Sequence, residues 1–150
     1  LGFSSGEDVE KEEYERNKEI ITEALKRNFR PEFLNRLDET ILFKNLTEKD
    51  VAKVSSIMLD EMAERLQKLD ISVTYGDSLV KFVSKEGFDK DYGARPLERV
   101  IRTKIEDSLA EAVLSGDVKK SDLIEIKVVK GKIKFNKKEE PKEDLEETIV

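Results

Sequence analysis

Two arginines, Arg36 and Arg95, are the residues of this chain best placed to do chemistry. Arg36 lies in the segment Phe-Arg-Pro-Glu-Phe-Leu-Asn-Arg-Leu-Asp at residues 29–38, and Arg95 lies in Tyr-Gly-Ala-Arg-Pro-Leu at residues 92–97. A guanidinium is permanently charged, and its planar fork matches the oxygens of phosphate and carboxylate groups. Both segments therefore indicate recognition of an anion.

The backbone around Arg36 is restricted by the preceding proline. Pro31 can open a helical turn because its fixed φ suits the first helical position. Arg36 then falls near the end of a short helix, where the helix dipole favours a cation. A simpler interpretation is a surface ion pair with Glu32 or Asp38, which would contribute only a few tenths of a kcal/mol.

Arg95 is predicted to stand at the start of a helix with little steric cover. Gly93 and Ala94 add almost no side-chain bulk, and the proline after Arg95 fixes the backbone. Helix N-termini favour anions over cations, so this position suits an arginine that meets an anionic ligand. Alternatively, Arg95 is a solvated arginine beside Glu98 and Asp91.

In their order and spacing, these motifs resemble the Clp family of AAA+ ATP-driven protein unfoldases, and in particular the end of the second ATPase module of a ClpC-like protein. The resemblance covers residues 1–136. It implies that Arg36 is the arginine finger, which reaches nucleotide bound by the neighbouring subunit. It also implies that Arg95, together with Gly93 and Ala94, forms the sensor-2 segment, which contacts nucleotide in its own subunit. Phosphoryl transfer depends largely on placing positive charge near phosphate, so these roles suit arginine.

The first three residues gain a meaning only from this resemblance. Leu1-Gly2-Phe3 would otherwise be an ordinary frayed end. In protease-linked Clp unfoldases, a similar tripeptide on a flexible loop docks into the ClpP peptidase. ClpB-like disaggregases share both arginine motifs but lack the tripeptide, so it favours an unfoldase that feeds substrates to ClpP.

The chain has no motif of its own for holding a triphosphate. A P-loop needs a glycine, four residues and then Gly-Lys-Ser/Thr. The Gly131-Lys132 pair is followed by Ile133 and has Ile126 in place of the first glycine. No strand ends in the paired acids of a Walker B motif. The chain is therefore expected to be a fragment that is inactive alone and binds no cofactor. Its parent would be an ATPase that uses ATP or ADP with magnesium.

The composition of the chain excludes several classes of function. The 150 residues carry a net charge of −6, which argues against general nucleic-acid binding. With no cysteine or histidine, disulfides, thiol catalysis and zinc fingers are excluded, and no metal site is expected. No apolar run approaches membrane-spanning length, and no signal segment is present. We therefore expect a cytoplasmic protein with no membrane contact. The resemblance to Clp unfoldases implies that its partners would be ClpP, copies of itself in a hexameric ring, protein substrates and adaptors.

The hydrophobic pattern predicts a mixed α+β fold. The resemblance implies that this fold is the small lid domain of an AAA+ module, preceded by the end of the large domain. We expect the large-domain part at residues 1–45, the small domain at 46–136 and a disordered charged tail at 137–150. In the first part, Ser4 to Glu19 should be flexible. A helix should then bury one face through Ile21, Leu25 and Phe29, and residues 39–43 should form a strand.

In the small domain, Thr47 should cap a helix that lasts until about Lys68. Its apolar face consists of Val51, Val54, Met58, Met62, Leu66 and Leu69. A strand at 71–75 and a helix at 77–87 should follow. A long helix should run from Pro96 to a cap at Gly116, and a hairpin should turn at Lys130-Gly131 and complete a three-stranded sheet.

Two other classes of function compete with the unfoldase. The first is a stand-alone interaction module that binds acidic or phosphorylated partners through Arg36 and Arg95. The second is a small enzyme that uses paired carboxylates such as Glu32 and Asp38, although no companion base or pocket pattern accompanies them.

Overall fold

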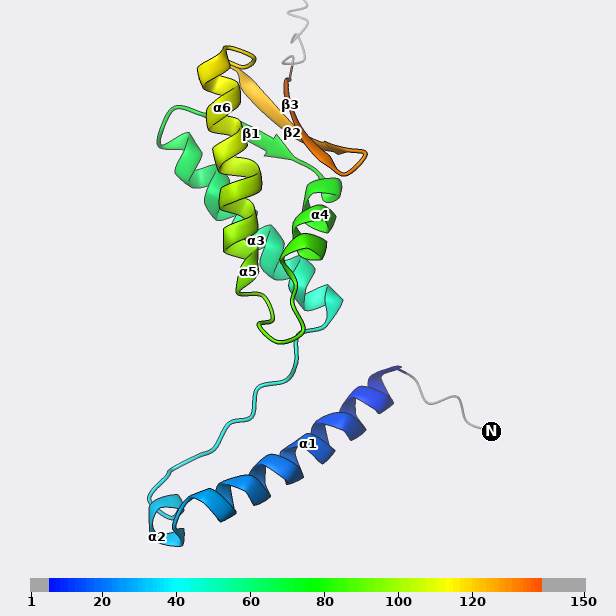
Figure 1. Cartoon of the computed structure of the whole chain (residues 1–150), viewed down its shortest axis with the longest axis vertical. Coiled ribbons are helices and arrows are strands. Elements are labelled where there is room, and N and C mark those ends of the chain that lie inside the picture. The colour runs from blue at the N-terminus through cyan, green and yellow to red at the C-terminus, as the bar shows by residue number, and fades with distance from the viewer. Residues whose placement is uncertain (1–5, 139–150) are drawn as a thin grey trace, which may run out of the picture. The chain divides into compact units, whose positions relative to one another are not determined.

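The computed structural model describes residues 6–138, and the chain divides between Asn45 and Leu46 into two compact units. The first unit contains the helices α1 and α2, and the second contains the other helices and a three-stranded sheet (Figure 1).

The first unit begins with the long helix α1, Gly6–Asn28. The predicted flexibility of residues up to Glu19 is therefore wrong from Gly6 onward. This stretch is rich in glutamate, lysine and arginine, which lose little side-chain freedom in a helix. Glu7 and Asp8 lie in the first turn and Lys26 and Arg27 in the last, which matches the helix dipole.

The predicted buried face of α1 is also wrong. No residue of the helix is buried, and Ile21 and Phe29 are 41% and 45% exposed. The apolar stripe exists, but the first unit offers it only the four-residue helix α2, Pro31–Leu34, and an extended segment. Within this unit, Tyr14 does contact that segment, since its hydroxyl lies 3.4 Å from the Leu42 carbonyl oxygen.

The strand predicted at residues 39–43 is absent. The segment has no regular secondary structure, and Ile41 and Phe43 are 68% and 87% exposed. A strand requires a neighbour for its backbone hydrogen bonds, and the described part of the first unit contains no other strand. Alternation of apolar residues was therefore insufficient to define a strand here.

The second unit opens with α3, Glu48–Gln67, and the predicted cap at Thr47 is confirmed. The Thr47 hydroxyl accepts a hydrogen bond from the Asp50 N–H (3.2 Å), and the Asp50 carboxylate accepts one from the Thr47 N–H (3.0 Å). This reciprocal capping box satisfies two backbone donors. The hydrogen bond from the Thr47 backbone holds the pKa of Asp50 below its usual value.

The buried face of α3 is close to the predicted one. Val51, Met62 and Leu66 are buried, and Val54 and Met58 pack against the core. Leu69 is 60% exposed because the helix has already ended, so its predicted core position is wrong. Leu59, fully buried, was missed.

Two predicted elements follow α3 and are confirmed. They are the strand β1, Ser72–Tyr75, and the helix α4, Asp77–Gly87. The Tyr75 hydroxyl donates to the Asp60 carboxylate on α3, and partial burial raises the pKa of Tyr75. This contact joins the strand to the first helix of the unit.

The long helix predicted from Pro96 is present but not regular. It consists of α5, Pro96–Val100, a π-helical stretch, η1, at Ile101–Glu106, and α6, Asp107–Ser115. Four residues of an α-helix overshoot one turn by about 40°. The wider π-turn offsets this drift, so Leu97, Ile101, Ile105 and Leu109, spaced by four, all remain buried. Gly116 ends the helix with φ 85°, as predicted.

The sheet has the order β1-β2-β3. Strand β2, Leu123–Val129, pairs in parallel with β1 and antiparallel with β3, Lys132–Lys137. The turn between β2 and β3 lies at Lys130 (φ 51°) and Gly131 (φ 71°), as predicted. Lys137 belongs to β3 and not to a tail, and residues 139–150 lie outside the described part.

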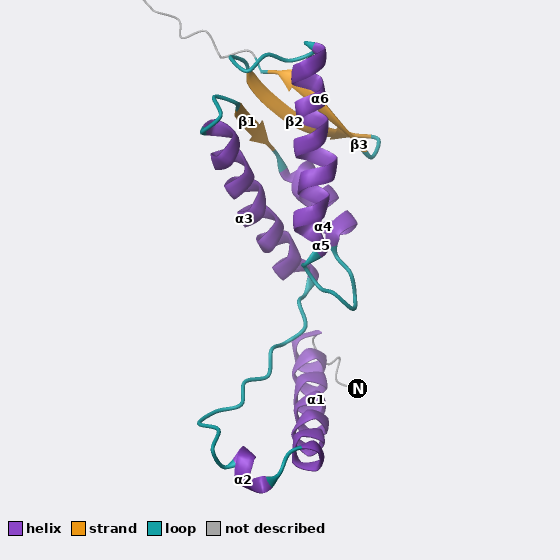
Figure 2. Ribbon diagram, turned by 60° about the vertical axis from the view of Figure 1, so that its left-hand side comes forward, coloured by secondary structure: helices purple, strands orange, loops and turns teal. Residues whose placement is uncertain are grey.

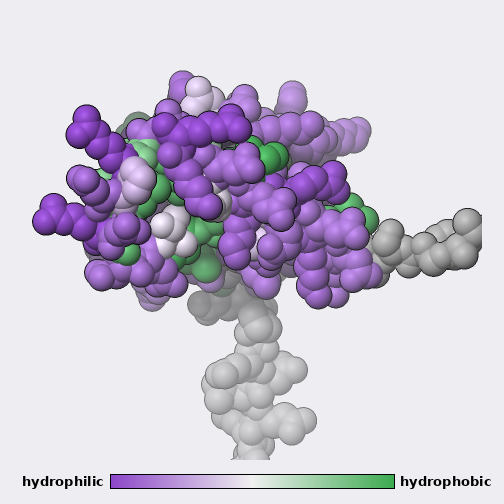
Figure 3. All heavy atoms as spheres, turned by 90° about the horizontal axis from the view of Figure 1, so that it is seen from below, coloured by the Kyte–Doolittle hydropathy of each residue, from purple (hydrophilic) through white to green (hydrophobic). Residues whose placement is uncertain are grey.

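Helices cover one face of this mixed sheet, and the predicted α+β fold is confirmed (Figure 2). Ile124 and Ile126 of β2 are buried in the same core as Leu79, Leu97 and Leu109. The face seen in Figure 3 is largely hydrophilic, with apolar side chains visible only in small groups. This agrees with a chain in which 41% of the residues are charged.

Candidate functional site

Arg36 lies in the turn immediately after α2. Pro31 occupies the first position of this helix, as predicted, and the Arg36 N–H donates to the Phe33 carbonyl (3.1 Å). The rings of Phe29 and Phe33 stack with their centroids 5.3 Å apart, which ties the end of α1 to α2. The Arg36 side chain is exposed.

Arg36 makes no ion pair with any residue between 6 and 138. The surface pairs that the sequence allows with Glu32 and Asp38 are thus not formed there. The guanidinium remains available to a group outside this unit.

Arg95 follows a tight turn whose first and last residues are hydrogen-bonded to each other through their backbones. Asp89 and Gly93 exchange both backbone hydrogen bonds, at 3.1 and 2.7 Å. The Asp89 carboxylate also accepts hydrogen bonds from the N–H groups of Asp91 (2.8 Å) and Tyr92 (3.0 Å). Gly93 has φ +64°, a conformation that glycine adopts without strain. The loop before Arg95 is therefore well ordered by its own hydrogen bonds.

Arg95 itself stands at the start of α5, as predicted, and its side chain is exposed. On either side, Leu97 is fully buried and Ala94 packs against the core. Arg95 forms no ion pair within residues 6–138, and its neighbour Glu98 pairs with Arg102 instead (3.1 Å). Among the residues that the structure describes, Arg95 is thus an exposed cation without an ion-pair partner, at a helix start anchored by buried neighbours.

Gly87 allows α4 and α5 to approach each other closely beneath this site. A Cβ at this position would lie 2.6 Å from Leu97 Cδ2 and 2.8 Å from Leu97 Cα. The second contact is with backbone, so a new methyl group could be accommodated only by moving the start of α5. The position of Arg95 therefore depends on this glycine.

We expect Gly87→Ala to destabilise the chain by about 1–3 kcal/mol, the usual cost of overpacking a core. Urea unfolding of the chain would measure the change. Gly76→Ala is the matched control, because a Cβ at Gly76 meets nothing within 4 Å and only the helix-cap preference changes. Equal losses for the two variants would contradict the close packing at Gly87.

The structure brings Gly93, Ala94 and Arg95 together in one turn. Arg36 belongs to the first unit and Arg95 to the second, so neither unit contains both arginines. The third predicted feature, Leu1-Gly2-Phe3, lies outside the described residues.

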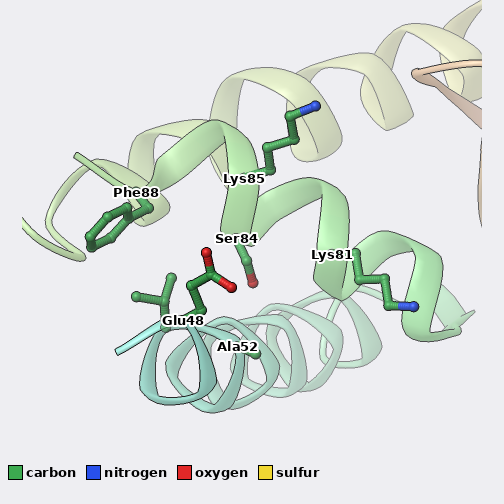
Figure 4. Close-up of a pocket in the computed structure, with 7 residues that line it drawn as sticks. Glu48, Ala52, Lys81, Ser84, Lys85 and Phe88 are labelled. Atoms are coloured by element: carbon green, nitrogen blue, oxygen red, sulfur yellow. The ribbon is translucent and has the colours of Figure 1, made fainter. Parts of the chain in front are cut away.

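Sequence reasoning missed a cavity of about 400 Å³ between α3 and α4. It is lined by Glu48, Val51, Ala52, Lys81, Ser84, Lys85 and Phe88. In Figure 4 Ser84 points from α4 toward α3, whereas the ammonium groups of Lys81 and Lys85 point away from the cavity. The sequence held no signal for it, because its walls are ordinary helix positions. None of the predicted site residues lines it.

Two negative findings apply to the described part of the chain. No helix there is long and apolar enough to cross a membrane. No group of three or more acidic side chains there is arranged to hold a metal ion.

The family model for the C-terminal, D2-small domain of ClpB protein matches residues 46–126, which is more than half of the chain. The chain belongs to the Clp family. Its second unit contains the residues that match this small domain of AAA+ Clp proteins.

Individual Clp proteins match over a longer stretch. The chaperone protein ClpC2 of Arabidopsis thaliana chloroplasts is 44% identical over 128 residues, which are 85% of this chain and 13% of that protein. An ATP-dependent Clp protease ATP-binding subunit, the ClpA homolog of Porphyra purpurea, is 43% identical over 122 residues, 81% of this chain and 15% of that protein. The chloroplastic ClpC4 of Oryza sativa is 48% identical over 109 residues, 73% of this chain and 12% of that protein. The chain therefore spans less than a sixth of these relatives.

Proposed function

We propose that this chain is the C-terminal part of an ATP-driven protein unfoldase, in which Arg95 is the sensor-2 residue and Arg36 the arginine finger. The observation that carries the proposal is the setting of Arg95, an exposed cation at a helix start where the dipole opposes it. Within the described residues, its side chain forms no ion pair that would stabilise it there. It suits an anionic ligand such as a nucleotide phosphate.

The anchoring of Arg95 explains how nucleotide would be coupled to motion. Leu97, Ile101 and Ile105, on the same continuous helix, are buried in the core of the second unit. A change in the position of this unit would therefore carry Arg95 with it as one body. In the parent protein, ATP or ADP with magnesium would supply the phosphate charge, and Gly93 and Ala94 would leave room beside it.

Arg36 would act on the nucleotide of the next subunit in a hexameric ring. Its exposure and lack of a partner among residues 6–138 support this role. The parent would act in the cytoplasm on protein substrates chosen by adaptors. Leu1-Gly2-Phe3 would dock the ring on the ClpP peptidase, and the name of the Porphyra purpurea relative, an ATP-binding subunit of Clp protease, supports that partner.

In the full-length parent, we expect Arg95→Ala to weaken the coupling between nucleotide and domain motion. The variant should then unfold much less folded substrate for each ATP that it hydrolyses. ATP turnover and substrate unfolding should be measured together. Arg99→Ala is the control, since Arg99 lies exposed on the same helix and forms no ion pair within residues 6–138. A normal ATPase rate with normal unfolding in the Arg95 variant would refute the sensor role.

A second candidate is a ClpB-like disaggregase without a peptidase partner. It is favoured by the family model that matches residues 46–126, which describes a ClpB domain. The two candidates share both arginine roles and differ in the use of Leu1-Gly2-Phe3. Replacement of that tripeptide therefore distinguishes them.

A further inference from the structure

Strand β3 is an edge of the sheet. It pairs with β2 along Lys132–Lys137, and no other described strand lies beside it. Figure 2 shows β3 at the margin of the sheet. Its outer side can therefore accept another strand, as edge strands in general can.

The register shows which backbone groups face outward. The Lys138 N–H donates to the Leu123 carbonyl (2.7 Å), and hydrogen-bonded and non-hydrogen-bonded pairs alternate along an antiparallel ladder. The N–H and C=O groups of residues 132, 134 and 136 thus face β2. Those of Ile133, Phe135 and Lys137 face the free edge.

The two faces of β3 differ in chemistry. Ile133 and Phe135 lie on the inner face and are half-buried against the core. Lys132 and Lys134 lie exposed on the outer face, and neither pairs with an acid within residues 6–138. Lys134 is also directly opposite Lys127 of β2, an arrangement of like charges that is unfavourable.

The charge of this region opposes that of the whole chain. Residues 118–138 contain eight lysines and two acidic residues, whereas the chain has a net charge of −6. Two of these lysines, Lys127 and Lys137, pair with Glu125 and Asp122. The remaining positive charge makes the β2-β3 hairpin attractive to an acidic partner and repulsive to the same strand of another copy.

We propose that the free edge of β3 binds an extended protein segment in which acidic and apolar residues alternate, as a fourth strand of the sheet. The outward backbone groups of Ile133, Phe135 and Lys137 would form the ladder. Acidic side chains would lie beside Lys132 and Lys134, and apolar ones beside Ile133 and Phe135. A nucleic acid would use the lysines but neither the backbone groups nor the apolar row. This inference does not depend on the proposed function.

The test is a titration of the 150-residue chain with a peptide of about six residues, the usual length of a strand, in which glutamate and valine alternate. Backbone NMR should show slowed hydrogen exchange at the amides of Ile133, Phe135 and Lys137. A peptide of the same composition, with its glutamates and valines in two separate blocks, should leave these amides unprotected. Equal protection by both peptides would overturn the proposal.

The charge contribution is tested with paired variants. Lys132→Glu with Lys134→Glu should weaken peptide binding about tenfold or more, because two attractive pairs become repulsive. Lys119→Glu with Lys120→Glu makes the same change of net charge in the loop before β2 and should have little effect at physiological salt. Equal weakening by the two double variants would mean that the peptide is attracted only by the net charge of the region and not by Lys132 and Lys134 at the edge. That result would overturn the proposal.

Two other occupants are distinguished in the same assay. An oligothymidylate that displaces the peptide and binds with equal affinity would identify a nucleic-acid surface. A chain ending at Lys138 that loses protection at Ile133, Phe135 and Lys137, and binds the peptide more tightly, would show that the chain's own acidic residues 139–150 occupy the edge. Either result would overturn the proposal of a separate protein partner.

Discussion

In the full-length assembled parent, Arg36→Ala should lower ATP turnover by about 10³-fold or more while leaving nucleotide binding largely intact. An arginine supplied from a neighbouring subunit stabilises charge that develops on phosphate in the transition state, and such fingers contribute about 10³–10⁵ in rate. Because the group acts on the transition state, its loss should appear in kcat and not in nucleotide affinity. Turnover and nucleotide affinity should be measured on the same assembled preparation.

Two controls separate this role from general damage. Arg27→Ala removes an exposed arginine that pairs only weakly with Glu23, at 3.5 Å, and should change neither quantity. A ring in which Arg36→Ala subunits are mixed with wild-type subunits should lose activity at the sites that face the variant subunits. Full turnover in the homogeneous Arg36 variant would exclude the finger.

Replacing Leu1-Gly2-Phe3 with alanines in the full-length parent should abolish degradation of a folded substrate by ClpP. Apolar anchors of this kind dominate binding when they fill pockets on a partner, so their removal should cost most of the affinity. ATP turnover should remain, because the tripeptide is separate from both arginine motifs. Degradation and ATP hydrolysis should be followed in one reaction with ClpP and ATP.

The control for this experiment replaces Ser4 and Ser5 with alanines, which alters the neighbouring residues and leaves the apolar pair intact. It should degrade the substrate normally. Unchanged degradation by the tripeptide variant would remove the docking role. It would then favour the ClpB-like alternative, in which the same parent releases its substrates intact.

The second unit could be predicted well because its signals are local. The capping box at Thr47, the glycine that ends the helix at Gly116 and the Lys130-Gly131 turn each act within a few residues. The first unit could not be predicted as well. The strand expected at residues 39–43 and the buried face expected on α1 both require another element to cover their apolar side chains. The spacing of apolar residues predicts burial only where such an element is present.

The π-helical stretch was missed although the sequence carried a signal for it. Leu97, Ile101, Ile105 and Leu109 repeat every four residues, and an α-helix has 3.6 residues per turn. A strict spacing of four over this length predicts either drift of the apolar face or a wider turn. The helix adopts the wider turn.

For the candidate site, the sequence indicated that Arg95 stands at a helix start, and its position there is observed. It did not indicate the hydrogen bonds of Asp89 or the close approach at Gly87, because both depend on how α4 meets α5 in three dimensions. The roles of Arg36 and Arg95 stay predictions until the variants are measured.

The π-turn at Ile101–Glu106 also lets this helix hold one more residue than its rotation requires. In a regular α-helix, the steps from Leu97 to Leu109 would rotate the chain by about 1,200°, which is about 120° beyond three full turns. Both side chains are buried in one core, so the wider turn absorbs the excess of about one residue. A related chain that lacks one residue there needs only a regular α-helix to keep its arginine pointing in the same direction, so a one-residue gap at this place in an alignment is compatible with an unchanged site.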